Sequence, residues 1–112
     1  MDDLAARYDP IIRQIAEIYA DDTELAAYIR GLRVNREVWD DGRAGGHFYF
    51  EDSPEDAGIE IIDAVADDAD RATIAVTLHL VGRCGNWAEW YRWDGEPVMR
   101  WPPPSVRGVP GR

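Results

Sequence analysis

The stretch that decides the fold is residues 59–82, IEIIDAVADDADRATIAVTLHLVG. Aliphatic residues occupy alternate positions on both sides of a short acidic segment, Asp67 to Asp70. Alternation with a period of two is typical of strands that bury one face. The stretch therefore predicts an antiparallel hairpin of strands 59–66 and 72–82, joined by an acidic turn.

The sequence after this hairpin predicts that the sheet continues. A further alternating segment covers residues 87–93, and the Asp94-Gly95 pair that follows it is typical of a two-residue type I′ hairpin turn. We therefore expect another strand at 96–101. The Pro-rich residues 102–112 end the sheet, and we expect an extended or mobile tail there.

Two segments before the sheet have apolar residues at helical spacing. Asp9-Pro10 is typical of a helix start, with Asp as the N-cap and Pro at the first helical position. Asp21 and Glu24 stand at capping-box spacing and predict the start of a second helix, which Gly31 is expected to end.

The region between the helices and the hairpin is harder to assign. Residues 32–39 alternate like a strand and would also fit a short helix, while His47 to Glu51 reads as a short aromatic strand. The whole pattern predicts an α+β fold, in which two N-terminal helices pack on a four- to five-stranded antiparallel meander. Residues 1–101 are expected to form a single domain and 102–112 its tail.

The register of the sheet follows from its turns. The Asp94-Gly95 turn places Glu89 opposite Arg100, and closing the preceding turn places His79 opposite Tyr91. One face of the sheet is then nearly pure hydrocarbon and is expected to lie under the helices: Ile62, Ala64, Ile74, Val76, Leu78, Leu80, Trp90, Met99 and Trp101. The other face mixes apolar and polar side chains: Ile59, Ile61, Asp63, Thr77, His79, Val81, Trp87, Glu89, Tyr91, Val98 and Arg100.

The mixed face is the candidate site, because a surface of that composition suits a pocket or a partner. If the protein is an enzyme, His79 beside Tyr91 would supply a general acid or base; otherwise both are ordinary core residues. The candidates for binding a ligand or partner are Asp63, Thr77, Trp87, Glu89, Trp93 and Arg100. Trp93, next to the predicted turn, is the tryptophan expected to be exposed.

Metal, cofactor and covalent chemistry find little support. The acidic turn lacks the Gly and the final Glu of a calcium loop, so we expect a solvated hairpin tip. His47 and His79 are too far apart in sequence for a metal motif, and Cys84 lies in a turn without an obvious base. We predict neither a metal nor a cofactor.

The chain carries a formal net charge of −10, and its twelve basic residues are all arginine. This composition is typical of GC-rich coding and favours a bacterial, actinobacterial-type source. Strong acidity disfavours nucleic acid and anionic membranes and suits a basic protein partner, although solubility alone would also explain it. Neither a secretory signal nor a membrane-spanning apolar run is recognisable, so we expect a cytoplasmic protein.

Part of the chain is similar to a known superfamily. Residues 65–76, VADDADRATIAV, followed by WYRWDG at 90–95 and by 98–101, resemble the C-terminal sheet of the SnoaL-like members of the nuclear-transport-factor-like cone fold. The resemblance implies a curved sheet around a pocket, in a cyclase, an isomerase or a binding domain. The N-terminal half departs from that pattern, since the segment before residue 59 is too short for a third helix, and no catalytic residue is carried over.

Three functions remain open at this point. The first is a small acidic bacterial binding protein without catalysis that engages a protein partner, for example a toxin-neutralising, immunity-like protein. The second is a SnoaL-like pocket protein or cofactor-free cyclase or isomerase with a small apolar ligand. The third is a homodimer that forms through the mixed face. Size, charge and the lack of a catalytic motif favour the first.

Overall fold

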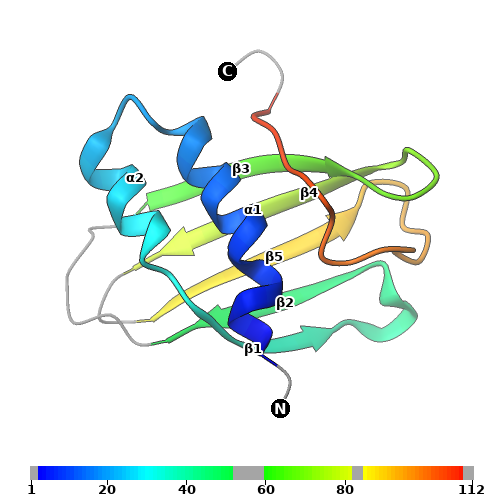
Figure 1. Cartoon of the computed structure of the whole chain (residues 1–112). Coiled ribbons are helices and arrows are strands. Elements are labelled where there is room, and N and C mark those ends of the chain that lie inside the picture. Colours follow the sequence, from blue (N-terminus) through cyan, green and yellow to red (C-terminus); the bar gives the residue numbers. More distant parts are fainter. Residues whose placement is uncertain (1–2, 52–59, 82–84, 110–112) are drawn as a thin grey trace.

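The computed structural model describes residues 3–51, 60–81 and 85–109. The described elements are α1 (Leu4–Ile18), α2 (Thr23–Arg30), β1 (Val34–Trp39), a 3-10 turn (Asp41–Arg43), β2 (Gly45–Phe50), β3 (Glu60–Asp67), β4 (Thr73–Leu80) and β5 (Asn86–Arg92). The strands form one antiparallel sheet in the order β1-β2-β5-β4-β3. Both helices lie on one face of that sheet (Figure 1). The predicted α+β class with N-terminal helices is confirmed.

Helix α1 begins earlier than the sequence predicted. Its N-cap is Asp3, whose carboxylate accepts a hydrogen bond from the backbone N–H of Ala6 at 3.2 Å. The predicted start at Asp9-Pro10 is wrong, because Pro10 lies inside the helix. A helix tolerates proline when the lost backbone hydrogen bond faces water, and both Pro10 and Ala6, which stands four residues before it, are exposed.

Helix α2 and strand β1 resolve the other uncertain boundaries. The N-cap of α2 is Asp22 rather than Asp21, and its carboxylate accepts from the backbone N–H of Leu25 at 3.1 Å. Gly31 caps the C-terminus as predicted, but with a φ of −82°, so its left-handed freedom is not used. The segment 32–39, which fitted either a strand or a helix, contains β1.

Strand β5 is the central strand of the sheet, with β4 on one side and β2 on the other. The predicted strand at 96–101 is wrong, because β2 already pairs with the edge of β5 where that strand was expected. After Gly95 the chain leaves the sheet plane, and the backbone N–H of Val98 donates to the carbonyl of Arg43 at 2.8 Å. Val98 is therefore buried beside the β1–β2 turn and does not lie on the mixed face.

The predicted registers of the other two hairpins were displaced by even numbers of residues. Trp90 lies opposite Val76 rather than Leu80, and Ala64 lies opposite Val76 rather than Ile74. An even displacement keeps every side chain on its own face of the sheet. The division into two faces is therefore as predicted, although the neighbours within each face are different.

The hydrocarbon face is covered and forms the core. Its fully buried strand residues are Phe48, Ile62, Ala64, Ala66, Ile74, Val76, Leu78, Leu80, Ala88 and Trp90. Trp101 packs over this face, and its ring stacks on Trp90 with centroids 4.4 Å apart. Met99, which was predicted on the same face, is 63% exposed because it belongs to the loop after β5. Burial of this face against α1 and α2 is the main stabilising term of the fold.

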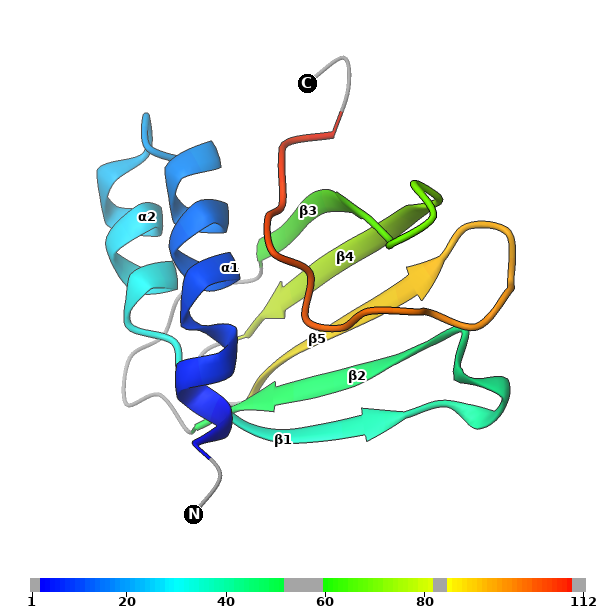
Figure 2. The ribbon, with the colours of Figure 1, turned by 45° about the vertical axis from the view of Figure 1, so that its right-hand side comes forward.

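The C-terminal segment is extended, as predicted, but it is packed rather than mobile over residues 102–109. It runs beside α1 and reaches the edge of β3 (Figure 2). Val65 and Arg107 exchange two backbone hydrogen bonds of 2.9 Å, and the side chain of Gln14 accepts from the backbone N–H of Val106 at 2.7 Å. The segment thus protects part of an exposed sheet edge.

Candidate functional site

The face of the sheet opposite the helices carries most of the predicted site residues, and we call it the open face. Its side chains form three rows across the strands. The first row is Arg36, Tyr49, Trp87, His79 and Ile61, the second is Val38, His47, Glu89, Thr77 and Asp63, and the third is Gly45, Tyr91, Ala75 and Val65. Three large apolar side chains of this face are exposed: Ile61 by 56%, Tyr91 by 54% and Val38 by 40%.

Glu89 occupies the middle of the second row, between two histidines. Its carboxylate oxygens lie 3.3 Å from Nε2 of His79 and 3.8 Å from Nε2 of His47. The other ring nitrogen of His47, Nδ1, lies 3.5 Å from a carboxylate oxygen of Asp40. A chain of alternating carboxylates and imidazoles therefore crosses β2, β5 and β4, and protonated imidazoles would pair with these carboxylates.

Aromatic rings make up most of the first row. The ring of Trp87 stacks on that of His79, with centroids 4.0 Å apart and planes inclined by 9°. The guanidinium of Arg36 lies 4.3 Å from the centre of the Tyr49 ring, a cation–π contact. The open face thus combines aromatic surface, carboxylates and a stacked guanidinium within a few strand spacings.

Two predicted side-chain pairs are wrong. His79 lies opposite Trp87, and Tyr91 lies opposite Ala75, so His79 and Tyr91 are in different rows. They do not form the acid–base pair that the sequence suggested. Glu89 cannot pair with Arg100 either, since both sides of β5 are occupied by other strands. The enzymatic hypothesis loses the geometry on which it was based.

The remaining predicted binding residues are divided between two places. Asp63 and Thr77 are neighbours in the second row, where the Thr77 hydroxyl donates to the Asp63 carboxylate at 3.1 Å. Arg100 lies on the loop after β5, away from the open face, and its backbone N–H donates to Asp68 at 2.9 Å. Trp93 is 68% exposed just past the end of β5, which confirms that expectation. Two residues singled out in the sequence lie outside the described residues: Ile59 and Cys84.

The sequence did not single out the contribution of β1 and β2 to the open face. His47 and Tyr49 face solvent, while Phe48 and Phe50 between and after them are buried. This alternation was readable, and it marks a strand with one buried face. What the sequence did not reveal was that β2 pairs with β5, which brings His47 opposite Glu89.

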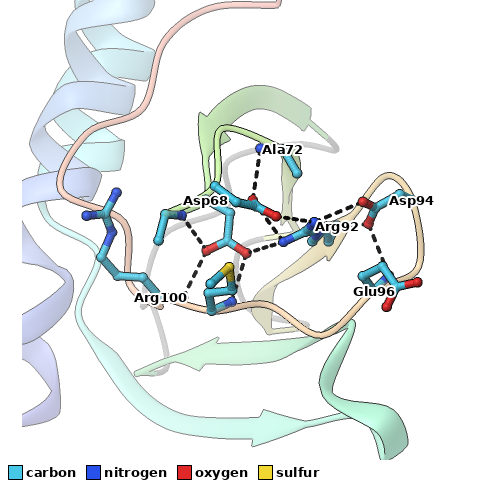
Figure 3. Close-up of polar contacts among 9 residues, drawn as sticks. Asp68, Ala72, Arg92, Asp94, Glu96 and Arg100 are labelled. Atoms are coloured by element: carbon cyan, nitrogen blue, oxygen red, sulfur yellow. Dashed lines mark hydrogen bonds and ion pairs between the residues drawn. The ribbon is translucent and has the colours of Figure 1, made fainter.

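The acidic turn between β3 and β4 is largely exposed, as expected, at Asp67, Ala69, Asp70 and Arg71, but Asp68 departs from that expectation. The side chain of Asp68 is fully buried. Its carboxylate accepts hydrogen bonds from the backbone N–H groups of Met99 at 2.8 Å, Arg100 at 2.9 Å and Ala69 at 2.9 Å (Figure 3). It also pairs with Nη1 of Arg92 at 2.9 Å. Asp68 therefore fastens the loop after β5 to the β3–β4 turn.

Arg92 binds two further carboxylates, Asp70 at 2.6 Å and Asp94 at 2.8 Å. Hydrogen bonds with Asp94 and Asp70 raise the pKa of Arg92, and the same contacts lower the pKa of each of those two carboxyl groups. Burial alone would raise the pKa of Asp68, but hydrogen bonds from Met99, Ala69 and Arg92 outweigh it and lower that pKa. All three carboxylates are engaged with Arg92, so we interpret the cluster as structural.

A second internal cluster ties α1 to the sheet. The hydroxyl of Tyr8, a fully buried residue, donates to Glu37 at 2.5 Å and accepts from the indole N–H of Trp101 at 2.6 Å. Burial, with the hydrogen bond to Glu37, raises the pKa of Tyr8. The indole N–H of Trp39 donates to the other oxygen of Glu37 at 3.0 Å. This cluster also has its donors and acceptors matched and serves packing.

Neither a metal site nor a membrane-spanning helix finds support in the described part of the chain. No group of three or more His, Cys, Asp or Glu side chains among these residues is placed to hold a metal ion, and no described helix combines the length and apolarity needed to cross a membrane. A surface pocket of about 430 Å³ lies on the helix side, lined by Ile18, Tyr19, Asp21, Asp22, Gly108 and Val109.

Comparisons of the chain with protein-family models, with curated proteins and with solved structures gave no significant match. The resemblance to SnoaL-like proteins therefore stays an expectation from the sequence.

Proposed function

We propose that this protein is a binding module without catalysis, which engages a basic protein partner through the open face. The observation that carries the proposal is the composition of this face. Exposed apolar side chains, among them Ile61 and Tyr91, stand beside the carboxylates of Asp63 and Glu89 in adjacent rows. His47 of the second row and His79 of the first row both contact Glu89.

Exposed apolar residues are ordinary when they occur singly, but here they share one sheet face. Val38 and Ile61 lie on opposite edge strands, and Trp87 and Tyr91 lie on the central strand between them. A face that exposes several apolar and aromatic side chains among polar groups suits an interaction, and aromatic residues are enriched in protein–protein interfaces. An exposed sheet face of this composition suits a protein surface better than a small molecule.

Charge specifies the kind of partner. The net charge of −10 attracts a basic protein and speeds the encounter, and this effect weakens as salt is added. A toxin-neutralising, immunity-like protein is one concrete form, because covering the surface of a basic toxin requires binding but no chemistry. A bacterial, cytoplasmic setting would be consistent with that role.

The other two functions have less support. A SnoaL-like pocket for a small apolar ligand needs walls around the open face, whereas Ile61 and Tyr91 of that face are more than half exposed. A homodimer through the open face would bring together two copies that each carry a net charge of −10, which opposes association. No specific observation favours either.

Binding to the products of neighbouring genes tests the proposal. Purified candidate partners would be titrated into the full chain by calorimetry, at salt concentrations from about 50 to about 300 mM. Tyr91→Ala should weaken binding by roughly tenfold, as for a central aromatic contact. Met99→Ala is the matched control, since Met99 is exposed to a similar degree but lies off the open face. Equal losses for both variants, or binding insensitive to salt, would refute the proposal.

A further inference from the structure

Glu89 holds the central place on the open face. It lies on the middle strand of the sheet, and its side chain is 39% exposed. Trp87 and Tyr91, two residues away on either side, point to the same face of β5. A partner that covers the open face therefore meets this carboxylate with an aromatic ring on each side of it.

The carboxylate of Glu89 is only partly engaged. Its contacts with the ring nitrogens of His79 and His47 measure 3.3 and 3.8 Å, whereas strong charge-assisted N–H···O bonds measure about 2.7–2.9 Å. An ionised carboxylate offers about four acceptor positions. Among the described residues, the two histidines approach it without making a short bond, so Glu89 can accept from an incoming donor.

The surroundings favour a guanidinium over an ammonium group. A guanidinium is planar, donates two parallel hydrogen bonds to one carboxylate and stacks on aromatic rings, while the ammonium of lysine is a compact point charge. The same face already contains such a stack within the chain, where Arg36 lies over Tyr49. An arginine placed at Glu89 would find the exposed ring of Tyr91 on one side, whereas the ring of Trp87 on the other side already stacks on His79 and lies 5.7 Å from the ring of His47.

We propose that Glu89, between Trp87 and Tyr91, anchors an arginine side chain of the basic partner. This inference rests on the proposed function and adds to it a selectivity for arginine over lysine. In the free protein His47 and His79 hold the carboxylate in place. When the partner binds, the guanidinium takes over the carboxylate oxygens, while His47 keeps Asp40 and His79 keeps its stack on Trp87.

Two peptides of equal charge, hexa-arginine and hexalysine, are suitable probes for the full chain. Binding would be followed by changes in the NMR signals of backbone amides and of the tryptophan indoles. We expect hexa-arginine to bind about threefold more tightly or better, the size of an exposed cation–π and bidentate contribution. Glu89→Gln, which keeps the side-chain shape, should abolish this preference and leave the affinity for hexalysine little changed.

The matched control is Glu24→Gln, which removes the same charge from an exposed position on α2. It should reduce the two affinities slightly and equally. Equal binding of the two peptides, or a preference that survives Glu89→Gln, would overturn the anchor. If in that case the signal changes still lie on the open face and fade with salt, the proposed function stands without the anchor. If the changes lie on the helix side instead, both proposals fail.

Discussion

Replacing Asp68 with Asn should destabilise the fold strongly while leaving its shape intact. One carboxylate oxygen accepts from Ala69 and Arg100, and the other accepts from Met99 and Arg92. An asparagine amide has a single acceptor oxygen and carries two donor hydrogens on its nitrogen. Whichever way the amide is turned, two donors lose their acceptor and face another donor.

The magnitude follows from these hydrogen bonds. Leaving a buried donor without an acceptor costs about 1–3 kcal/mol, so two such donors give roughly 2–6 kcal/mol. The loop after β5 is partly exposed and can relax, which places the expected loss of unfolding free energy near 3 kcal/mol. Arg92 keeps Asp70 and Asp94 as partners, so its charge adds no further penalty. For a domain of this size the melting temperature should fall by roughly 10 °C.

Urea unfolding measures the loss, and Asp67→Asn is the matched control one residue away. Asp67 pairs with Arg107 at 3.1 Å, and both side chains are about half exposed, so this change should cost less than about 1 kcal/mol. Amide hydrogen exchange at Met99 and Arg100 should accelerate in Asp68→Asn only. The reasoning fails if Asp68→Asn unfolds like Asp67→Asn, or if exchange at these two amides is unchanged.

Three further predictions concern the core and the charged cluster. The pKa values of the carboxyl groups around Arg92 are lowered in the folded state. The unfolding free energy should therefore be constant above about pH 5 and decrease as the pH falls below that value. Thermal melting at a series of pH values measures this dependence. Tyr8→Phe leaves the indole N–H of Trp101 without its acceptor and should cost about 1–3 kcal/mol in urea unfolding. Gly46→Ala would place a Cβ against the backbone oxygen of Val38 and should cost at least about 1–3 kcal/mol of unfolding free energy. Gly31→Ala is the control, because a Cβ there meets nothing closer than 3.5 Å, and it should be tolerated. Thermal melting of the two variants distinguishes these outcomes.

The two faces of the sheet were predictable from sequence because the face of a strand residue depends only on whether it stands an even or an odd number of positions from its neighbours along the strand. Ile74, Val76 and Leu78 alternate with polar or small residues whatever their partners are. Registers that were wrong by two or four residues therefore left every side chain on its correct face. Neighbour relations depend on the absolute register, so the pairing of His79 with Tyr91 failed while the face that carries both was correct.

The false strand at 96–101 has a different cause. A turn does form here, and Gly95 has a positive φ of 76°. The predicted type I′ turn is wrong, however, because Asp94 does not have the positive φ that such a turn requires, and the backbone N–H of Gly95 closes the turn on the carbonyl of Arg92 at 3.0 Å. Asp94 uses its carboxylate to bind Arg92 and the backbone N–H of Glu96, and the chain then turns away from β5. Strand β2, some forty positions earlier in the sequence, takes the edge that a hairpin would have used. Such long-range pairing leaves no local trace in a single sequence.

The acidic residues of the chain include two groups with different roles, and this changes how the net charge should be interpreted. Asp68, Asp70 and Asp94 surround Arg92 and are committed to the fold, so they contribute to net charge but offer few free acceptors. Glu89 and Asp63 lie in one row of the open face, where water still reaches them. A count of acidic residues does not separate these groups, whereas burial and contacts do. The carboxylates of the open face are therefore only a small part of the acidic residues behind the net charge of −10, and in our proposal the contact with a basic partner centres on Glu89.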